Sequence, residues 1–251
     1  MIKGLEIFRE YFHDYKEQYV LIGGAACDVL FDAAATSFRA TKDLDIVLIV
    51  ESLTPEFDTK FWQFVNDGQY ENRARSSGKP QFYRFDKPKA SGYPYMIELF
   101  SRSDAVFSAG EEQVLIPLHL GDEISSLSAI LLNAEYYSML TTGKEVIADV
   151  VILSQLYLIP FKAKAWLDLS ARKAQGQHVD ERDIKKHKND VVRLTALLSG
   201  EEECPLPNGV KADMLAFVNQ FEQEPVDLKS LKLNFIAASD IVRVLRAVYQ
   251  L

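Results

Sequence analysis

Apolar residues recur at two different periods near the start of the chain. Ile2, Leu5, Phe8 and Phe12 follow a helical spacing, which predicts an amphipathic first helix. The next apolar run, Tyr19–Ile22, is short and rich in β-forming side chains, so it predicts a strand. The change of period indicates a mixed helix-and-strand region at the N-terminal end.

The stretch from Tyr19 to Val50 predicts a strand, a Gly-Gly turn, a helix, a loop and a second strand. Asp43 and Asp45 open the second strand and flank Leu44, so both carboxylates project from the same face. The apolar run IVLIV that follows is typical of a strand buried on both faces. Acids at the start of a buried strand repel one another and are costly to desolvate. A divalent metal ion is the simplest cation to offset this cost.

The middle of the chain predicts one helix, a loop and a pair of strands. Thr54 followed by Pro55 is a helix-start pattern, and the helix should run to about Asn66. Residues 66–79 are polar and predict a loop. Gln81–Phe85 and Tyr93–Phe100 then predict strands joined by a turn.

Two features of this region have an ordinary alternative. Gly23-Gly24 could bring backbone amides close to an anion, or could be a plain strand-to-helix turn. Glu98, between Ile97 and Leu99, could be a third carboxylate of a site, or could mark the wet face of an edge strand. Neither pattern decides between the two readings alone.

The C-terminal part has a helical pattern. From about Val146 the chain predicts one or two long helices, with Pro160 at a start or a kink. A break follows at Gln175–His178, and Asp180 is expected to cap the next helix. Two more helices are expected near residues 211–221 and 239–249. We predict an α/β (α+β) protein with a mixed sheet flanked by helices in residues 1–150 and a helical domain in residues 151–251.

Composition and charge narrow the functional classes. The chain has 251 residues, is 48% hydrophobic and carries a net charge of −8, which argues against a whole-surface nucleic-acid binder. Between Pro160 and Arg193, however, nine Lys and Arg residues stand against five acids. This excess could be a solvated, ion-paired helix face, or could hold a phosphate-bearing substrate. Cys27 and Cys204 are too far apart in sequence to suggest a metal motif or a disulfide framework.

The first residues mix acids among their apolar side chains, which is not the pattern of a signal peptide. The longest apolar region is interrupted by Ser154 and Gln155 and is too short to span a bilayer. We therefore predict a soluble, cytoplasmic protein without a membrane partner.

The pattern IGG, an 18-residue spacer, DLDIV and a later IELF resembles the signature of polymerase-β-type nucleotidyltransferases. The run from Arg39 to Asp45 is similar to the stretch before the acids in the AbiEii-type toxin branch of that superfamily. The segments SQLYLIPFKAKAWLDLSARK and DIKKHKNDVVRLTALL resemble the helical half of the same branch. The spacer is longer than in the compact signature, and the third acid is Glu98 where Asp is more usual.

The resemblance implies roles for individual residues. It makes Asp43, Asp45 and Glu98 ligands of Mg²⁺ and catalytic residues, with Glu98 also the candidate base for the acceptor hydroxyl. It also implies a set of nucleotide-binding residues, which are Gly23, Gly24, Thr41, Lys162 and Lys188. Of these, Lys162 is implied to be catalytic as well.

The activity that this resemblance implies is Mg²⁺-dependent transfer of a nucleoside monophosphate from an NTP to an acceptor hydroxyl. The acceptor could be tRNA or another RNA, a protein or a small molecule, and a toxin-like role would add a neutralising antitoxin protein as a partner. The alternative is a non-catalytic nucleotide-sensing or partner-binding protein of the same fold.

Overall fold

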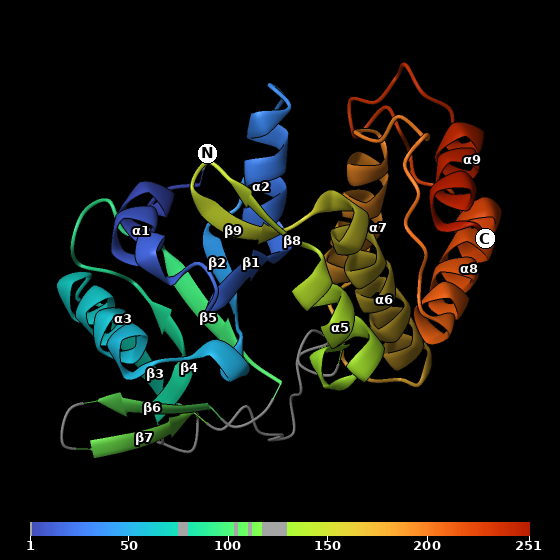
Figure 1. Ribbon diagram of the computed structural model, residues 1–251. Helices are drawn as coiled ribbons and strands as arrows, with labels where there is room; N and C mark the ends of the chain where they lie inside the picture. The colour runs from blue at the N-terminus through green and yellow to red at the C-terminus, as the bar shows by residue number, and fades with distance from the viewer. Residues whose placement is uncertain (1, 75–79, 103–104, 110–111, 117–129) are drawn as a thin grey trace. The chain divides into compact units, whose positions relative to one another are not determined.

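The structure is a computed structural model that describes residues 2–74, 80–102, 105–109, 112–116 and 130–251. Contacts within the chain divide it into two compact units. The first contains Met1–Ile124 and Leu140–Ser154, and the second contains Ser125–Met139 and Gln155–Leu251. It belongs to the α/β class, with a mixed sheet and flanking helices followed by a helical region (Figure 1).

The elements of the first unit, in chain order, are α1 (Leu5–Phe12), η1 (His13–Tyr15), β1 (Tyr19–Ile22), α2 (Gly23–Ala33), β2 (Asp43–Leu48), η2 (Val50–Ser52), α3 (Pro55–Asp67), β3 (Glu71–Ala74), β4 (Pro80–Asp86), β5 (Met96–Phe100), β6 (Ala105–Ala109), β7 (Glu112–Ile116), β8 (Lys144–Ile147) and β9 (Val150–Leu153). The main sheet has the order β3-β4-β5-β2-β1-β9-β8, and β6 and β7 form a separate hairpin. Strand β2 pairs antiparallel with β1 and parallel with β5.

The first unit packs its aromatic core on one face of the sheet. Phe8 and Phe12 of α1 contact Tyr19 of β1 and Phe64 of α3 through ring-to-ring packing. Helices α1 and α3 cover this face, and α2 lies on the other (Figure 1). Thr54 caps α3 as predicted, because its hydroxyl accepts a hydrogen bond from the Phe57 amide at 3.3 Å.

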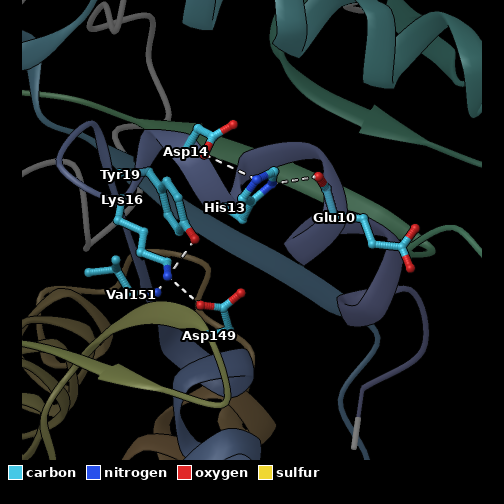
Figure 2. Close-up of polar contacts among 7 residues, drawn as sticks. All are labelled: Glu10, His13, Asp14, Lys16, Tyr19, Asp149 and Val151. Carbon is cyan, nitrogen blue, oxygen red and sulfur yellow. Dashed lines mark hydrogen bonds and ion pairs between the residues drawn. The ribbon is translucent and has the colours of Figure 1, made fainter.

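The β8–β9 hairpin is tied to the N-terminal segment. Ala148 and Asp149 have positive φ angles of 50° and 65°, the pattern of a tight hairpin turn. Figure 2 shows Lys16 next to the Asp149 carboxylate, with which it forms an ion pair, and the Val151 amide donating to the Tyr19 hydroxyl at 3.5 Å. Lys16 lowers the pKa of Asp149 below its ordinary value of 3.8, mainly by hydrogen bonding.

The helical elements, in chain order, are α5 (Ala134–Thr142), whose last residues belong to the first unit, α6 (Gln155–Ala174), α7 (Glu181–Thr195), α8 (Asn208–Gln223) and α9 (Ala238–Tyr249). Asp180 caps α7 as predicted and accepts from the Arg182 amide at 2.8 Å. Pro160 lies inside α6. In the described part of the chain, no helix is both long and apolar enough to cross a membrane.

Two local predictions are wrong. Residues 66–79 were predicted as a loop, but Glu71–Ala74 forms the edge strand β3, which pairs with β4. Its polar sequence lacks the apolar positions by which a strand is recognised. Val150–Leu153 was predicted as helix but forms strand β9. It is buried at every position, and such a continuous apolar run does not distinguish a buried strand from a helix.

Candidate functional site

Three sequence-predicted carboxylates lie on one face of the sheet. Asp45 of β2 is directly opposite Glu98 of β5, and Asp43 precedes Asp45 by two positions on the same strand. Directly aligned residues in paired strands, and residues two apart in one strand, project to the same side. The alternating positions Leu44 and Ile97 are fully buried on the opposite face. The three carboxylates therefore form an acidic patch on one face, here called the acidic face, whereas Val47, two positions after Asp45 on the same side, is buried.

Glu98 does not lie on an edge strand, contrary to the ordinary alternative for this residue. Strand β5 is paired on one side with β2 and on the other with β4. Glu98 therefore does not mark the solvated side of an edge strand. The residues aligned with it are Asp45 on β2 and Arg84 on β4, so it lies among charged side chains.

Gly23 brings the start of α2 against the Asp45 carboxylate. It is the first residue of α2, it has a φ of 65°, and a Cβ built on it would lie 1.8 Å from Asp45 Oδ2. A side chain at this position would meet both a strained backbone and an occupied space. The close approach of Asp45 to this helix end therefore requires glycine.

Gly24 makes a similar approach to the loop before β2. A Cβ on Gly24 would lie 2.4 Å from the Thr41 hydroxyl oxygen. The N-cap residue of α2 is Ile22, which offers no side-chain acceptor, and the first turn contains no acid. The first amides of α2 are thus left without a side-chain cap from Ile22, a condition that suits a bound anion. The sequence-predicted residues Gly23, Gly24, Thr41 and Asp45 come together here.

Arg84 is a residue of this face that the sequence analysis missed. It lies on β4 directly opposite Glu98, and its Nε and Nη2 both contact Glu98 Oε1. The Glu98 side chain is 15% exposed and that of Arg84 34%. The ion pair therefore engages one oxygen of Glu98 and leaves Oε2 outside these contacts. The pairing of β4 with β5, which sequence alone does not give, is what brings Arg84 here.

Asp86 is a second missed residue. It is 6% exposed and lies opposite Met96, which is itself opposite Asp43, so the order across the sheet is Asp43, Met96, Asp86. Two strand spacings of about 4.8 Å separate Asp86 from Asp43, too far for the two carboxylates to share an ion without a rearrangement. We assign Asp86 to the surroundings of the site.

The donor types on this face fit a hard divalent cation, since Asp43, Asp45 and Glu98 all offer carboxylate oxygens. Among the residues that the structure describes, however, no three His, Cys, Asp or Glu side chains gather closely enough to hold a metal ion. Asp43 and Asp45 share one strand face, and Glu98 is engaged by Arg84. A cation here would be held first by the two aspartates, with Glu98 joining if it left Arg84.

Lys162 of α6 belongs to the helical unit and has a carboxylate partner there. Its Nζ lies 3.1 Å from Asp190 Oδ2 of α7, and the two side chains are 5% and 0% exposed. Arg193 lies 3.9 Å from the other oxygen of Asp190. The buried pair gives the inward-pointing lysine a structural reason. The contact of Lys162 with a nucleotide stays a prediction.

The neighbouring Lys164 is engaged differently. Its Nζ lies 3.3 Å from Asp168 and 3.2 Å from Asp213, and its side chain is 27% exposed. Lys162 and Lys164 therefore point to different partners, as expected for residues two apart in a helix. Lys188 of α7 is also buried in the helical unit.

Comparison of the chain with models of protein families, with curated proteins and with solved structures finds no match. The observations that bear on function are therefore the motif resemblance and the geometry of the acidic face.

Proposed function

We propose that this chain transfers a nucleoside monophosphate from an NTP to an acceptor hydroxyl in a Mg²⁺-dependent reaction. The observation that supports this most directly is the close approach of Asp45 to Gly23, on the same face as Asp43 and Glu98. It combines a glycine-bounded helix start, suited to phosphates, with carboxylates suited to a hard cation.

Each half of the motif has a separate task in this proposal. The amides of Gly23 and Gly24 bind the triphosphate at the start of α2, while Thr41 lies against Gly24 and fixes the edge of this cradle. Asp43 and Asp45 hold the cation. When bound, Mg²⁺ neutralises phosphate charge and lowers the energy of the developing negative charge on the leaving pyrophosphate.

Glu98 is proposed to act on the acceptor. Arg84 holds Glu98 Oε1, which orients the carboxylate, and Oε2 can accept the proton of an approaching hydroxyl. The hydroxyl oxygen then attacks the α-phosphorus and pyrophosphate leaves. We therefore treat Arg84 as a positioning residue for Glu98.

The acceptor and the biological role are proposed from the resemblance to the AbiEii-type branch. RNA such as tRNA, a protein side chain or a small molecule each supplies a suitable hydroxyl. A toxin-like role would require an antitoxin protein to neutralise the activity. Contacts of Lys162 and Lys188 with the nucleotide belong to the same proposal.

One observation favours a second candidate, a nucleotide-sensing or partner-binding protein without turnover. Arg84 already engages Glu98, and no three-residue metal group is formed in the part of the chain that the structure describes. A Glu98 that stayed on Arg84 would leave the cation with two protein carboxylates and could allow binding without efficient transfer.

Calorimetric titration with each NTP, with and without Mg²⁺, tests the two candidates. Both predict Mg²⁺-dependent binding that Asp45→Asn weakens. The transferase additionally predicts release of pyrophosphate when cellular RNA or protein is added as acceptor. Binding without pyrophosphate release over the whole acceptor panel would favour the sensor, and no binding in any condition would contradict both.

A further inference from the structure

The helical unit contains a cavity of about 520 Å³ formed largely by α6 and α7. This volume lies within the ordinary range for small-molecule sites. Its lining combines an apolar wall with several charged groups. The lining residues that matter here are Trp166, Lys173, Glu181, Ile184, Lys185, Lys188 and Glu224.

The charges around this cavity are unequal. Lys173, Lys185 and Lys188 supply three cations, whereas Glu181 and Glu224 supply two carboxylates. Lys173 and Glu181 form an ion pair. The lining therefore has one more cation than acid in a chain of net charge −8, and this local excess favours an anionic ligand.

Lys188 is the most enclosed of these cations. Its side chain is 10% exposed, and its Nζ lies 5.1 Å from the ring centre of Trp166 and 5.9 Å from that of Phe221. It donates to the backbone carbonyl of Glu224 and lies 3.9 Å from the carboxylate of that residue, which is 88% exposed. Burial lowers the pKa of Lys188, because the ammonium has lost solvation that the nearby Glu224 only partly replaces.

We propose that this cavity binds a phosphate ester of nucleotide size. Lys188 and Lys185 bind the phosphate, and the exposed Glu224 carboxylate moves aside for it. The apolar part of the ligand packs against Ile184 and Trp166 of the lining. No residue of the sheet lines the cavity, and Lys188 moves from the transfer proposal to this separate site.

The two tryptophans of the chain make a direct binding assay possible, because Trp166 lines the cavity and Trp62 belongs to α3. Trp62→Phe leaves Trp166 as the sole indole. The substitution should be tolerated, since the buried Trp62 Nε1 has no hydrogen-bond partner within the described residues. Fluorescence of this variant is then titrated with AMP, inorganic phosphate and adenosine in EDTA.

A saturable change with AMP, a weaker response to phosphate and none with adenosine are the expected results. Lys188→Met, which keeps the length and removes the charge, should abolish the response, and Lys185→Ala should weaken AMP binding about tenfold. Lys186→Ala is the matched control, because Lys186 is adjacent in α7 but does not line the cavity. It should change affinity less than twofold.

No saturable response to AMP would overturn the proposal, as would equal effects of Lys185→Ala and Lys186→Ala. Lys185 is exposed, so its variant remains informative if Lys188→Met does not fold. Binding must also persist in an Asp45→Asn background; loss there would assign the signal to the sheet and contradict a separate site. Conversely, persistent binding without any transfer activity would contradict only the proposed function.

The nucleotide could be free or could be the end of an RNA strand. A short oligoribonucleotide with a terminal phosphate, titrated beside AMP, distinguishes these sources. Tighter binding of the oligonucleotide that Lys185→Ala weakens indicates an RNA end, and equal or weaker binding indicates the free nucleotide. If Lys185→Ala and Lys188→Met leave the affinity for the oligonucleotide unchanged and AMP gives no response, the proposal is contradicted.

Discussion

The sheet face and the α6–α7 contact both bury carboxylates, partly on the sheet and fully between the helices, but with different surroundings. Asp190 of the helical unit is fully buried and has two cations near it, Lys162 at 3.1 Å and Arg193 at 3.9 Å. On the sheet face, three carboxylates project to one side, and Arg84 pairs with one of them, Glu98. The first arrangement surrounds one acid with two cations, whereas the second groups three acids on one face of the sheet.

This difference separates a structural use of charge from a functional one. A buried ion pair whose groups satisfy each other holds helices together, and it can contact a ligand only if the pair opens. Acids that share a face repel one another, and a bound divalent cation offsets that repulsion. We therefore expect substitutions to affect mainly stability in the helical unit and mainly activity on the sheet.

Lys162→Met should have the largest effect on stability. It leaves Asp190 buried with only the more distant Arg193 of its two described cations, and loss of one partner of a buried pair costs about 3–5 kcal/mol. Chemical denaturation measures the free energy of unfolding. The double variant Lys162→Met/Asp190→Leu should recover much of this loss, because neither charge is then buried alone.

Lys164→Met is the matched control on the same helix. Lys164 is partly exposed and should contribute only about 1 kcal/mol or less. Equal losses from the two single variants would contradict the structural reading of Lys162. A raised NTP KM in folded Lys162→Met protein, unmatched by Lys164→Met, would instead support the predicted phosphate contact.

Asp45→Asn should have the largest effect on activity. Losing a ligand charge removes several kcal/mol of electrostatic stabilisation, so transfer should fall by roughly 100-fold or more. The free energy of unfolding should not decrease, because repulsion with Asp43 and Glu98 is relieved. Asp32→Asn, on the exposed side of α2, is the control and should leave both quantities unchanged. An unfolded Asp45→Asn protein would show that the acid is structural.

Gly23→Ala tests the close approach that supports the proposed site. A side chain at a φ of 65° costs about 1–3 kcal/mol in strain alone, and the added Cβ would also collide with Asp45. Gly176→Ala provides the comparison, since its φ is 80° and nothing lies within 4 Å of the added Cβ. Thermal unfolding should therefore show the greater loss at Gly23, accompanied by reduced NTP binding. If Gly23→Ala and Gly176→Ala lost equal thermal stability and NTP binding were unchanged, the Gly23–Asp45 contact would no longer support the proposed site.

Lys16→Met should have the smallest effect, and one that depends on pH. Because Lys16 lowers the pKa of Asp149 in the folded state, the stabilisation is present above the unfolded pKa of about 3.8 and is lost as pH falls through the folded value. The wild type should be slightly more stable than Lys16→Met near pH 6, and the two should converge as the pH falls through the lowered pKa of Asp149. A difference that grows as pH falls would contradict this sign.

Much of the fold follows from local signals that the sequence states directly. The caps Thr54 and Asp180 and the helical spacing in α1, α7, α8 and α9 predict elements that the structure confirms. The failures at β3 and β9 have a common cause. Strand pairing is a long-range interaction, so a polar edge strand and a fully apolar strand both lack the alternating pattern that identifies a strand.

The site divides in the same way. Strand periodicity predicts that Asp43 and Asp45 share a face, and the structure places them so and brings Gly23 against Asp45; their role in a site stays a prediction. Arg84 and Asp86 could not be found from spacing, since their place in the site comes from the register of β4 on β5. Asp190, the partner of Lys162, could not be predicted either, because the contact depends on how α6 and α7 pack against each other.

Transfer of a label from NTP to an acceptor tests the central claim most directly. The protein is incubated with Mg²⁺, total cellular RNA or protein, and each NTP labelled either at the α-phosphate or at the γ-phosphate. The proposed reaction predicts that α-label enters an acceptor, that γ-label leaves as pyrophosphate, and that Asp45→Asn abolishes both. Acceptor labelling from the γ-phosphate would indicate a kinase, and α-labelling that survives in Asp45→Asn would contradict the role assigned to the acidic face.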